Sequence, residues 1–287
     1  MDPGRASMTA MGTALMRAAH TRLDDPILID DPWGDRLIPD EEREAMLADS
    51  GAQDADAALR AHPAYGTVIM RSRYTEDALA DAVGRGVGQY VVVGAGLDSF
   101  ALRRPAFASE LQIFEVDHPA TQEFKTTRLA ACEIPPPPGL HLVAADLSEI
   151  GLDVALASSP FRSDERAFFS WLGVTVYLTR EANLATLTAI ASCAPAGSEL
   201  VFGYADQQLL DSTAGPMQEA RARVAAAGEP WVSGFDPREL GSDLRGAGLE
   251  LLEDLGPEEL GARYCTGRTD GLTPSPSSHV AHARVAS

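Results

Sequence analysis

The chain has few cysteines and no long apolar run. Its three cysteines, Cys132, Cys193 and Cys265, are odd in number and far apart, which argues against a disulfide framework and against a zinc site. No stretch approaches the roughly 20 apolar residues that a membrane-spanning helix needs. The N-terminal segment also lacks the continuous apolar run of a signal peptide. We therefore expect free thiols, no bound metal, no membrane segment and a cytoplasmic protein.

The chain also has little positive charge. It carries 23 Lys and Arg residues against 42 Asp and Glu residues, which gives a formal net charge of −19 at pH 7. Such a surface repels phosphate backbones, so we do not expect nucleic acid as a substrate or partner. Solubility alone explains the acidity. Hydrophobic residues make up 45% of the chain, which is ample for a buried core.

Strand and helix patterns alternate from residue 89 onward. Short apolar runs predict strands at 89–93, 111–116, 141–144, 167–172 and 199–203. Helices are expected to begin near Pro119 and Thr179, which suit a first helical position and an N-cap. A helix and a strand follow in PRELGSDLRGAGLELLEDLG, and SSHVAHARVAS gives a last strand. With no helix between the last two strands, the final one would be antiparallel. The alternation predicts an α/β fold with a mostly parallel sheet.

Two segments depart from this alternation. The residues before 86 are expected to be helical, with helices at about 40–48 and 53–61 and an amphipathic helix over 65–83. Residues 205–235 interrupt the pattern after the fifth strand and include a predicted helix at 215–227. Ligands of open α/β sheets bind at the carboxyl ends of the strands. The interruption is therefore either a lid over a substrate or a surface excursion, with equal weight.

A glycine turn follows the first predicted strand. The sequence VVVGAGLDS supplies Gly94 and Gly96, and glycines there let the backbone pass close to a ligand. Ser99 at the third position of the dinucleotide fingerprint makes the match to that fingerprint imperfect. Asp98 would be repelled by a pyrophosphate and attracted by a sulfonium or an amino group, although it could instead cap a helix. The turn therefore favours S-adenosylmethionine over NAD.

Acidic residues also end the next two predicted strands. Glu115 in FEVD lies 21 positions after Gly94, where an acid can accept hydrogen bonds from ribose hydroxyls. Asp146 in VAADL, with Leu147 beside it, could accept a bond from an adenine amino group. Together with Asp98, these acids place carboxylates after three successive strands. This combination indicates a cofactor site more specifically than any one of the three acids does.

These residues and their flanking sequences resemble the leucine carboxyl methyltransferase-like family of S-adenosylmethionine-dependent methyltransferases, especially its bacterial small-molecule branch. The matching segments are RSRYTEDAL (71–79), QYVVVGAGLDSFALRRP (89–105), FEVDHPATQEFK (114–125), AADL (144–147) and FFSWLGVTVYLT (168–179). The resemblance implies a Rossmann-like class I methyltransferase fold with seven strands, the last one antiparallel. It also implies a helical extension at 1–85 and a cofactor-binding core at 86–287 that carries the 205–235 insertion.

The resemblance further implies a set of cofactor-binding residues. One arginine of the pair Arg71 and Arg73 would bind the methionine carboxylate. Two arginines two positions apart on a helix cannot both face one ligand, and Arg71 is preferred. The glycine turn would lie at the methionine part, Glu115 at the ribose, and Asp146 with Leu147 at the adenine. The full predicted set is Arg71, Arg73, Gly94, Ala95, Gly96, Asp98, Glu115, Val116, Asp146, Leu147 and Trp171.

One departure from the family pattern bears on the substrate. Many relatives carry Trp-Glu-Gly after the fourth strand, whereas this chain reads Trp171-Leu172-Gly173. The missing acid weakens the inference of a protein substrate, and so of C-terminal carboxyl methylation. We expect an O-methyltransferase that acts on a carboxylate or hydroxyl of a small molecule, with secondary metabolites among the candidates.

A hydroxyl acceptor usually needs a general base, whereas a carboxylate does not. The candidate bases are His20, His62, His118, Tyr177 and Tyr204, and none lies in a decisive motif. Tyr177 and Tyr204 are kept as weak catalytic candidates, and Lys125 is interpreted as a surface or scaffold charge. The remaining alternatives are an NAD-dependent oxidoreductase and a non-catalytic S-adenosylmethionine-binding protein. The sequence does not predict the oligomeric state.

Overall fold

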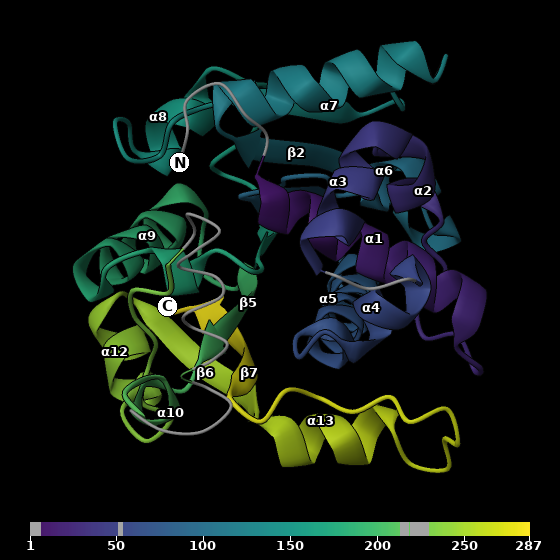
Figure 1. Cartoon of the computed structure of the whole chain (residues 1–287). Helices are drawn as coiled ribbons and strands as arrows, with labels where there is room; N and C mark the ends of the chain where they lie inside the picture. The colour runs from purple at the N-terminus through teal and green to yellow at the C-terminus, as the bar shows by residue number, and fades with distance from the viewer. Residues whose placement is uncertain (1–6, 51–53, 213–217, 219–229) are drawn as a thin grey trace.

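The computed structural model describes residues 7–50, 54–212, 218 and 230–287 (Figure 1). Five helices precede the first strand, and the last of them leads directly into the sheet. They are α1 (Met8–Leu23), α2 (Trp33–Leu37), α3 (Asp40–Ser50), α4 (Ala55–Ala61) and α5 (Tyr65–Gly84). The predicted helices at about 40–48, 53–61 and 65–83 correspond to α3, α4 and α5.

A seven-stranded sheet forms the centre of the molecule. Its strands are β1 (Gln89–Val93), β2 (Gln112–Asp117), β3 (Leu140–Ala144), β4 (Ala167–Trp171), β5 (Glu199–Ala205), β6 (Leu249–Leu255) and β7 (Ser278–Val285). Their order across the sheet is β3-β2-β1-β4-β5-β7-β6, and β7 is antiparallel to both of its neighbours. The prediction of an α/β fold with seven strands and an antiparallel last strand is confirmed.

Helices cover both faces of this sheet (Figure 1). On one face α8 (Leu152–Ala157), α9 (Arg180–Cys193) and α12 (Leu240–Gly246) pack against residues such as Phe169 and Trp171. On the other face α5 packs through Ile69 and Leu79 against Tyr90 and neighbouring residues. Every residue of β1, β4 and β5 is buried, as expected for parallel strands covered on both sides.

Two details differ from the sequence expectation. A helix, α13 (Pro257–Tyr264), lies between β6 and β7, so the last strands are not joined directly. Pro257 at its first position and the acids Glu258 and Glu259 in its first turn are ordinary helix-start signals. The strand β7 is nevertheless antiparallel, because α13 and the following loop bring the chain back to the same end of the sheet, where Leu255 at the end of β6 pairs with Val280 near the start of β7.

The interruption after β5 begins and ends beside the same edge of the sheet. It starts with α10 (Gln207–Leu210), and at its far end Phe235 N donates to Ala205 O at 3.0 Å. Val232 N donates to Val176 O at 2.6 Å, in the loop after β4. The predicted helix at 215–227 lies outside the described residues, apart from residue 218.

No helix in the described part of the chain is long and apolar enough to cross a membrane. Across the same residues, no group of His, Cys, Asp and Glu side chains is arranged to hold a metal ion.

Candidate functional site

The turn after β1 has a backbone that only glycine adopts easily. Gly94 and Gly96 have φ angles of 69° and 55°, in the left-handed region. A Cβ atom on Gly94 would lie 2.5 Å from Val174 Cγ2, and one on Gly96 would lie 3.0 Å from the Cβ of Ala10 in α1. The turn is thus enclosed by the loop after β4 on one side and by α1 on the other. Gly94 N and Ala95 N both donate to Val116 O, at 2.9 and 3.2 Å, so buried Val116 fixes the turn through its main chain.

Glu115 lies inside the protein rather than at the surface of a binding site. It is 0% exposed, and its Oε2 forms an ion pair with the buried Nζ of Lys125 on α7 (Pro119–Ala131). Burial raises the pKa of Glu115 to about 7 even though Lys125 acts in the opposite direction. The predicted ribose contact of this carboxylate would require its surroundings to open.

Asp117, two residues further along, is the acid that faces the turn, and sequence reasoning missed it. Its Oδ2 accepts a hydrogen bond from Gly96 N at 2.5 Å, and its Oδ1 accepts one from His118 N at 2.6 Å. Burial raises the pKa of Asp117, against the effect of these two N–H donors. The signal was present in the sequence, since FEVD ends on this residue and alternate strand residues share a face.

Asp146 and Leu147 lie at the end of β3, close to the same edge. Asp146 Oδ1 accepts hydrogen bonds from Ser148 N and Ser148 Oγ, at 2.9 and 2.6 Å, and these bonds lower the pKa of Asp146. Its Oδ2 lies 3.6 Å from His118 Nε2. Leu147 is 36% exposed, so an apolar side chain and a carboxylate are both open to solvent there.

Asp98 and Ser99 have structural partners. Asp98 Oδ1 accepts a hydrogen bond from Phe100 N at 2.8 Å, at the start of the short helix α6 (Phe100–Arg103). Ser99 Oγ donates to Asp31 Oδ2 at 2.5 Å. Arg17 on α1 also pairs with Asp31, at 2.7 Å, and donates to Leu97 O at 2.9 Å. Position 99 therefore ties the N-terminal segment to the turn, and Arg17 is a second cation near it that sequence reasoning did not find.

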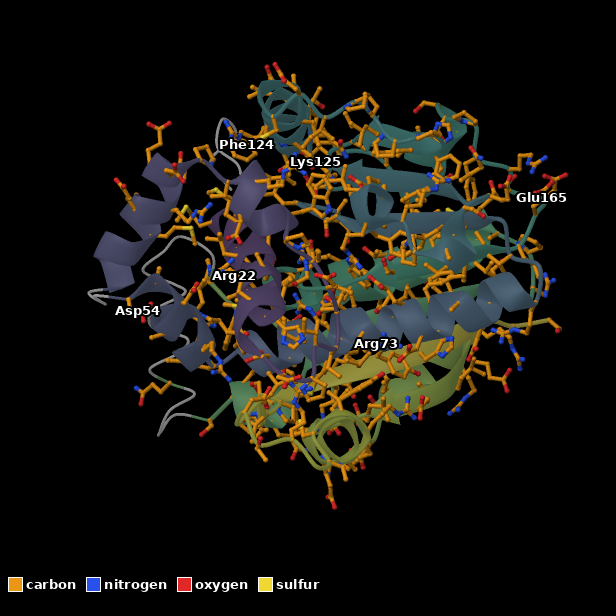
Figure 2. All side chains as sticks on the ribbon, turned by 90° about the vertical axis from the view of Figure 1, so that its right-hand side faces the viewer. Arg22, Asp54, Arg73, Phe124, Lys125 and Glu165 are labelled. Carbon is orange, nitrogen blue, oxygen red and sulfur yellow. The ribbon has the colours of Figure 1, made fainter. Side chains whose placement is uncertain are left out.

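The two arginines of α5 have different surroundings. Arg73 forms an ion pair with Asp77 at 2.5 Å, and its side chain is 44% exposed on the outer side of the helix (Figure 2). Arg71 points toward the sheet, where its guanidinium lies against Gly173 and its stem against Gly203. No carboxylate among the described residues pairs with Arg71, and burial lowers the pKa of Arg71 to about 10. Arg71 is thus a half-buried cation without an internal counter-ion in the part of the chain that the structure describes.

The segment after β4 places its residues in two directions. Trp171 is 1% exposed and packs against Phe202, with ring centroids 6.3 Å apart, so its side chain belongs to the core. Leu172 points to the other side of the sheet, toward Gly203. A Cβ atom added to Gly203 would lie within 4.0 Å of both the Cδ2 of Leu172 and the Cδ of Arg71. The position that carries an acid in many relatives is therefore an apolar neighbour of Arg71.

The candidate bases are mostly engaged elsewhere. His20 lies 2.6 Å from Asp24 Oδ2 and accepts from Leu28 N, and burial lowers its pKa. His118 caps α7 by accepting from Ala120 N. Tyr204 is buried and donates to Asp254 Oδ2 at 2.7 Å. Tyr177 lies nearer to Arg71, with which it interacts electrostatically, and its hydroxyl is 3.2 Å from Thr9 Oγ1.

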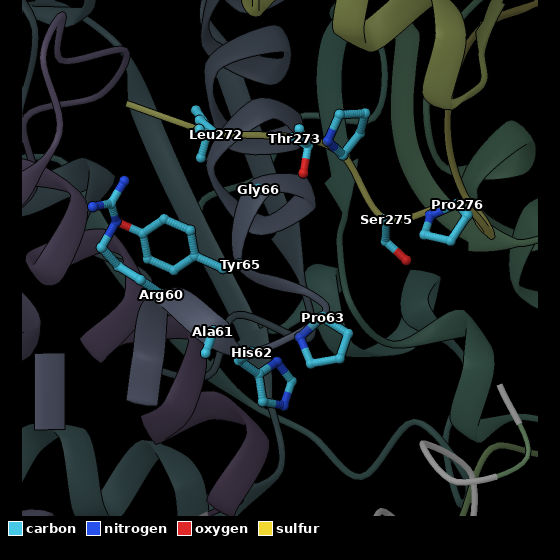
Figure 3. A pocket seen from close by; sticks show the side chains of 12 residues that line it. Arg60, Ala61, His62, Pro63, Tyr65, Gly66, Leu272, Thr273, Ser275 and Pro276 are labelled. Carbon is cyan, nitrogen blue, oxygen red and sulfur yellow. The ribbon is translucent and has the colours of Figure 1, made fainter. Parts of the chain in front are cut away.

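A pocket of about 280 Å³ lies at the N-terminal end of α5 (Figure 3). His62, Tyr65 and the loop before β7 line it, together with the stem of Arg60. The guanidinium of Arg60 pairs with Asp24 at 2.8 Å and donates to Asp270 O at 2.7 Å, so it is already neutralised. None of the predicted cofactor residues lines this pocket.

Comparisons with known proteins agree with the sequence resemblance. The model of the leucine carboxyl methyltransferase family matches residues 10–191, more than half of the chain. The Bacillus subtilis (strain 168) protein YktD is 32% identical over 99% of both chains. A relative from Mycolicibacterium smegmatis is 33% identical over 72% of this chain and 70% of its own. Both names assign these proteins, provisionally, to the S-adenosyl-L-methionine-dependent methyltransferases.

Solved structures share the fold. A protein from Thermobifida fusca YX, described provisionally as a methyltransferase, superposes with a TM-score of 0.58 at 17% identity and covers 88% of this chain and 94% of its own. A DUF574 family protein from Streptomyces avermitilis gives a TM-score of 0.57 at 16% identity, covering 85% and 90%. At such low identity these two compare the fold only. The family model and the relative that matches end to end show that the chain belongs to the leucine carboxyl methyltransferase family.

Proposed function

We propose that this chain transfers a methyl group to a carboxylate or hydroxyl oxygen of a small molecule. As a member of its family it is an S-adenosyl-L-methionine-dependent methyltransferase. The finer points, namely the acceptor class and the residue roles, rest on the contacts of the site. Secondary metabolites are the first compounds to screen as acceptors.

The residues at the C-terminal edge of the sheet fit this cofactor. Arg71 is a half-buried cation with no carboxylate partner among the described residues, and it would hold the methionine carboxylate. Gly94 and Gly96 allow close approach of the methionine part, and Asp117 is the better candidate for the ribose because Glu115 is enclosed. Asp146 and Leu147 would lie against the adenine. Arg73, paired with Asp77 on the outer side of α5, is not assigned a role.

The bound cofactor supplies an electrophilic methyl group on a sulfonium centre. The chain must bind this cofactor, orient the acceptor oxygen in line with it and keep water away. Helix α1 contributes to the exclusion of water, since Ala10 closes over Gly96. Tyr177, which lies next to Thr9 and interacts electrostatically with Arg71, would contact the acceptor.

A carboxylate is the favoured acceptor. The observation that carries this choice is the engagement of the candidate bases His20, His118 and Tyr204 in structural hydrogen bonds. A carboxylate is ionised at neutral pH and needs no base, whereas a hydroxyl must lose its proton during the reaction. A methyl ester is then the expected product.

Two measurements test this function. Calorimetric titration with S-adenosylmethionine, S-adenosylhomocysteine and NAD should show binding of the first two and none of NAD. An acceptor screen with radiolabelled methyl donor should then compare matched carboxylic acids and alcohols of the same carbon skeleton. Mild alkali releases methanol from an ester and leaves an ether intact. Alkali-stable products would contradict the carboxylate assignment, and binding of NAD alone would overturn the cofactor.

A further inference from the structure

Lys125 is the only lysine in the chain. The sequence has 23 Lys and Arg residues together, so the other 22 are arginines. Lysine side chains are almost never fully buried without a partner, yet Lys125 is 1% exposed beneath α7 (Figure 2). The single position that carries an amine instead of a guanidinium is therefore also an interior one.

The ammonium of Lys125 joins three elements of the cofactor site. Its Nζ donates to the main-chain oxygen of Asp98 at 2.6 Å, in the turn after β1. It also forms the ion pair with Glu115 on β2, while its own backbone belongs to α7. Gln122, one turn earlier on α7, donates from Nε2 to Glu115 O at 2.8 Å. One nitrogen atom thus links the turn to both β2 and α7, in addition to the main-chain bonds that join the turn to β2.

The same ammonium is surrounded by negative charge. The carboxylates of Asp98 and Asp117 both act electrostatically on Glu115, in the direction opposite to Lys125. Asp117 is itself stabilised as a carboxylate by Lys125 and by the N–H of Gly96. Three acids that converge on one wall would repel one another without a cation between them. Lys125 acts in this way on Glu115 and Asp117, and Arg103 on α6 also interacts electrostatically with Asp98.

A compact amine suits this position better than a guanidinium. Lysine presents a point charge with three donors, whereas arginine presents a wide planar fork of five. Glu115 Oε1 and Gln122 Oε1 are buried without a hydrogen-bond partner among the described residues. Both atoms are acceptors, so the groups around Lys125 offer fewer donors than acceptors. An arginine fork has donors for these atoms, but its head is larger, and at 1% exposure Lys125 is enclosed by packed neighbours that this head would have to displace.

We propose that Lys125 is a positioning residue for the cofactor site, which holds the turn at Asp98 and balances the acids so that Asp117 is presented to the ligand. It touches neither the cofactor nor the acceptor. This role rests on the proposed cofactor site. It predicts that ligand affinity depends on Lys125 even where the fold does not.

The single lysine allows a direct test on the unmodified protein. Growth on lysine labelled with ¹⁵N at Nζ gives one side-chain ammonium signal, which reports on Lys125 alone. Saturating S-adenosylhomocysteine should shift this signal and slow the exchange of its protons with water. An unchanged signal, with binding established by calorimetry in the same sample, would overturn the proposal.

Two substitutions and a matched control test the consequence for binding. Lys125→Met should raise the Kd for S-adenosylhomocysteine at least about tenfold, and Lys125→Arg should not restore it. Arg268→Met is the control, because Arg268 is also buried, pairs with Asp270 and donates to a main-chain oxygen, that of Pro26. It should lower thermal stability by a similar amount and change Kd less than about twofold.

The outcomes separate this proposal from the proposed function. Unchanged affinity in folded Lys125→Met would overturn the role of Lys125 alone. Full affinity in Lys125→Arg would show that only a charge is needed and would overturn the requirement for an amine. No binding by the unsubstituted protein would overturn the cofactor assignment and this role with it. If Lys125→Met does not fold, the ammonium signal of the unsubstituted protein decides.

Discussion

Replacing Arg71 with methionine would show which of the two arginines of α5 binds the cofactor. Arg71 lies between Gly173 and Gly203 with no carboxylate partner among the described residues, whereas Arg73 pairs with Asp77 near the surface. Methionine keeps much of the apolar stem and removes only the charged head. The substitution therefore tests whether the guanidinium serves the protein or a ligand.

The magnitude follows from the burial of the charge. The pKa of Arg71 falls well below its usual range, to about 10, because the guanidinium is shielded from water. This difference corresponds to roughly 3 kcal/mol of destabilisation of the charged form, an upper value because the residue is only partly buried by surface area. A carboxylate that binds the guanidinium would recover a charge-assisted hydrogen bond of about 1.5–3 kcal/mol, or about 10–100-fold in Kd.

Arg71→Met should therefore leave the ligand-free protein as stable as before, or more stable, while weakening the binding of S-adenosylhomocysteine about 10–100-fold. Urea unfolding without ligand and calorimetric titration give the two quantities. Arg73→Met is the matched control, and it should lose only the few tenths of a kcal/mol that a surface pair contributes. The reasoning is refuted if Arg73→Met weakens binding more than Arg71→Met does, or if Arg71→Met destabilises the free protein and leaves Kd unchanged.

Three further predictions concern the turn and its acids. Gly94→Ala should abolish ligand binding in calorimetry, because its Cβ would meet Val174 and its φ of 69° is strained for alanine; adding Val174→Ala should restore binding only in part. Asp117→Asn should raise Kd at least about tenfold, and an unchanged Kd would remove Asp117 from the ribose site. Glu115 has a folded-state pKa of about 7, above its usual 4.5, so the free energy of unfolding should fall as pH rises from about 4.5 to 7. Glu115→Gln should flatten that slope in urea unfolding at several pH values, and an equal slope in both proteins would count against the raised pKa.

The fold could be predicted because its signals are local. Buried strands such as QYVVV, the glycine turn and the alternation with helices fix a parallel sheet, and the observed strand boundaries differ from the predicted ones by two residues at most. The helix α13 was missed although Pro257 and the acids after it mark its start. It has only eight residues and follows β6 almost directly, so the strand pattern of β6 hid it.

The choice between Arg71 and Arg73 could not be made from spacing alone. Residues two apart on a helix point in opposite directions, but which direction faces the ligand depends on how α5 packs on the sheet. The packing of Ile69 and Leu79 against the sheet sets that rotation. The sequence therefore limits the predicted carboxylate-binding cation to two residues, and the tertiary structure shows how the surroundings of these two differ.

The acid that we propose for the ribose differs by two residues from the one that the sequence predicted, and the register of the sheet gives the reason. In the β1–β2 ladder Val92 lies opposite Glu115 and Val93 lies opposite Val116. The turn that follows Val93 therefore meets β2 beyond Val116, where Asp117 stands. Glu115 falls within the paired body of the strand and has to find its counter-ion inside the protein. Counting from Gly94 gave a plausible acid, but only the register tells which of two acids on one face reaches the turn.

The same register explains why Lys125, interpreted from the sequence as a surface or scaffold charge, is a buried scaffold charge. On α7 alone, a lysine three residues after Gln122 in an acidic protein is typical of a solvated helix face. Once Glu115 is enclosed in β2, a cation has to reach it from the helix that covers that strand, and Lys125 is the residue that does. The burial of Lys125 thus follows from the burial of Glu115, ten positions earlier in the sequence. A buried ion pair between a strand and its covering helix cannot be recognised from one sequence, because neither residue alone indicates that it is buried.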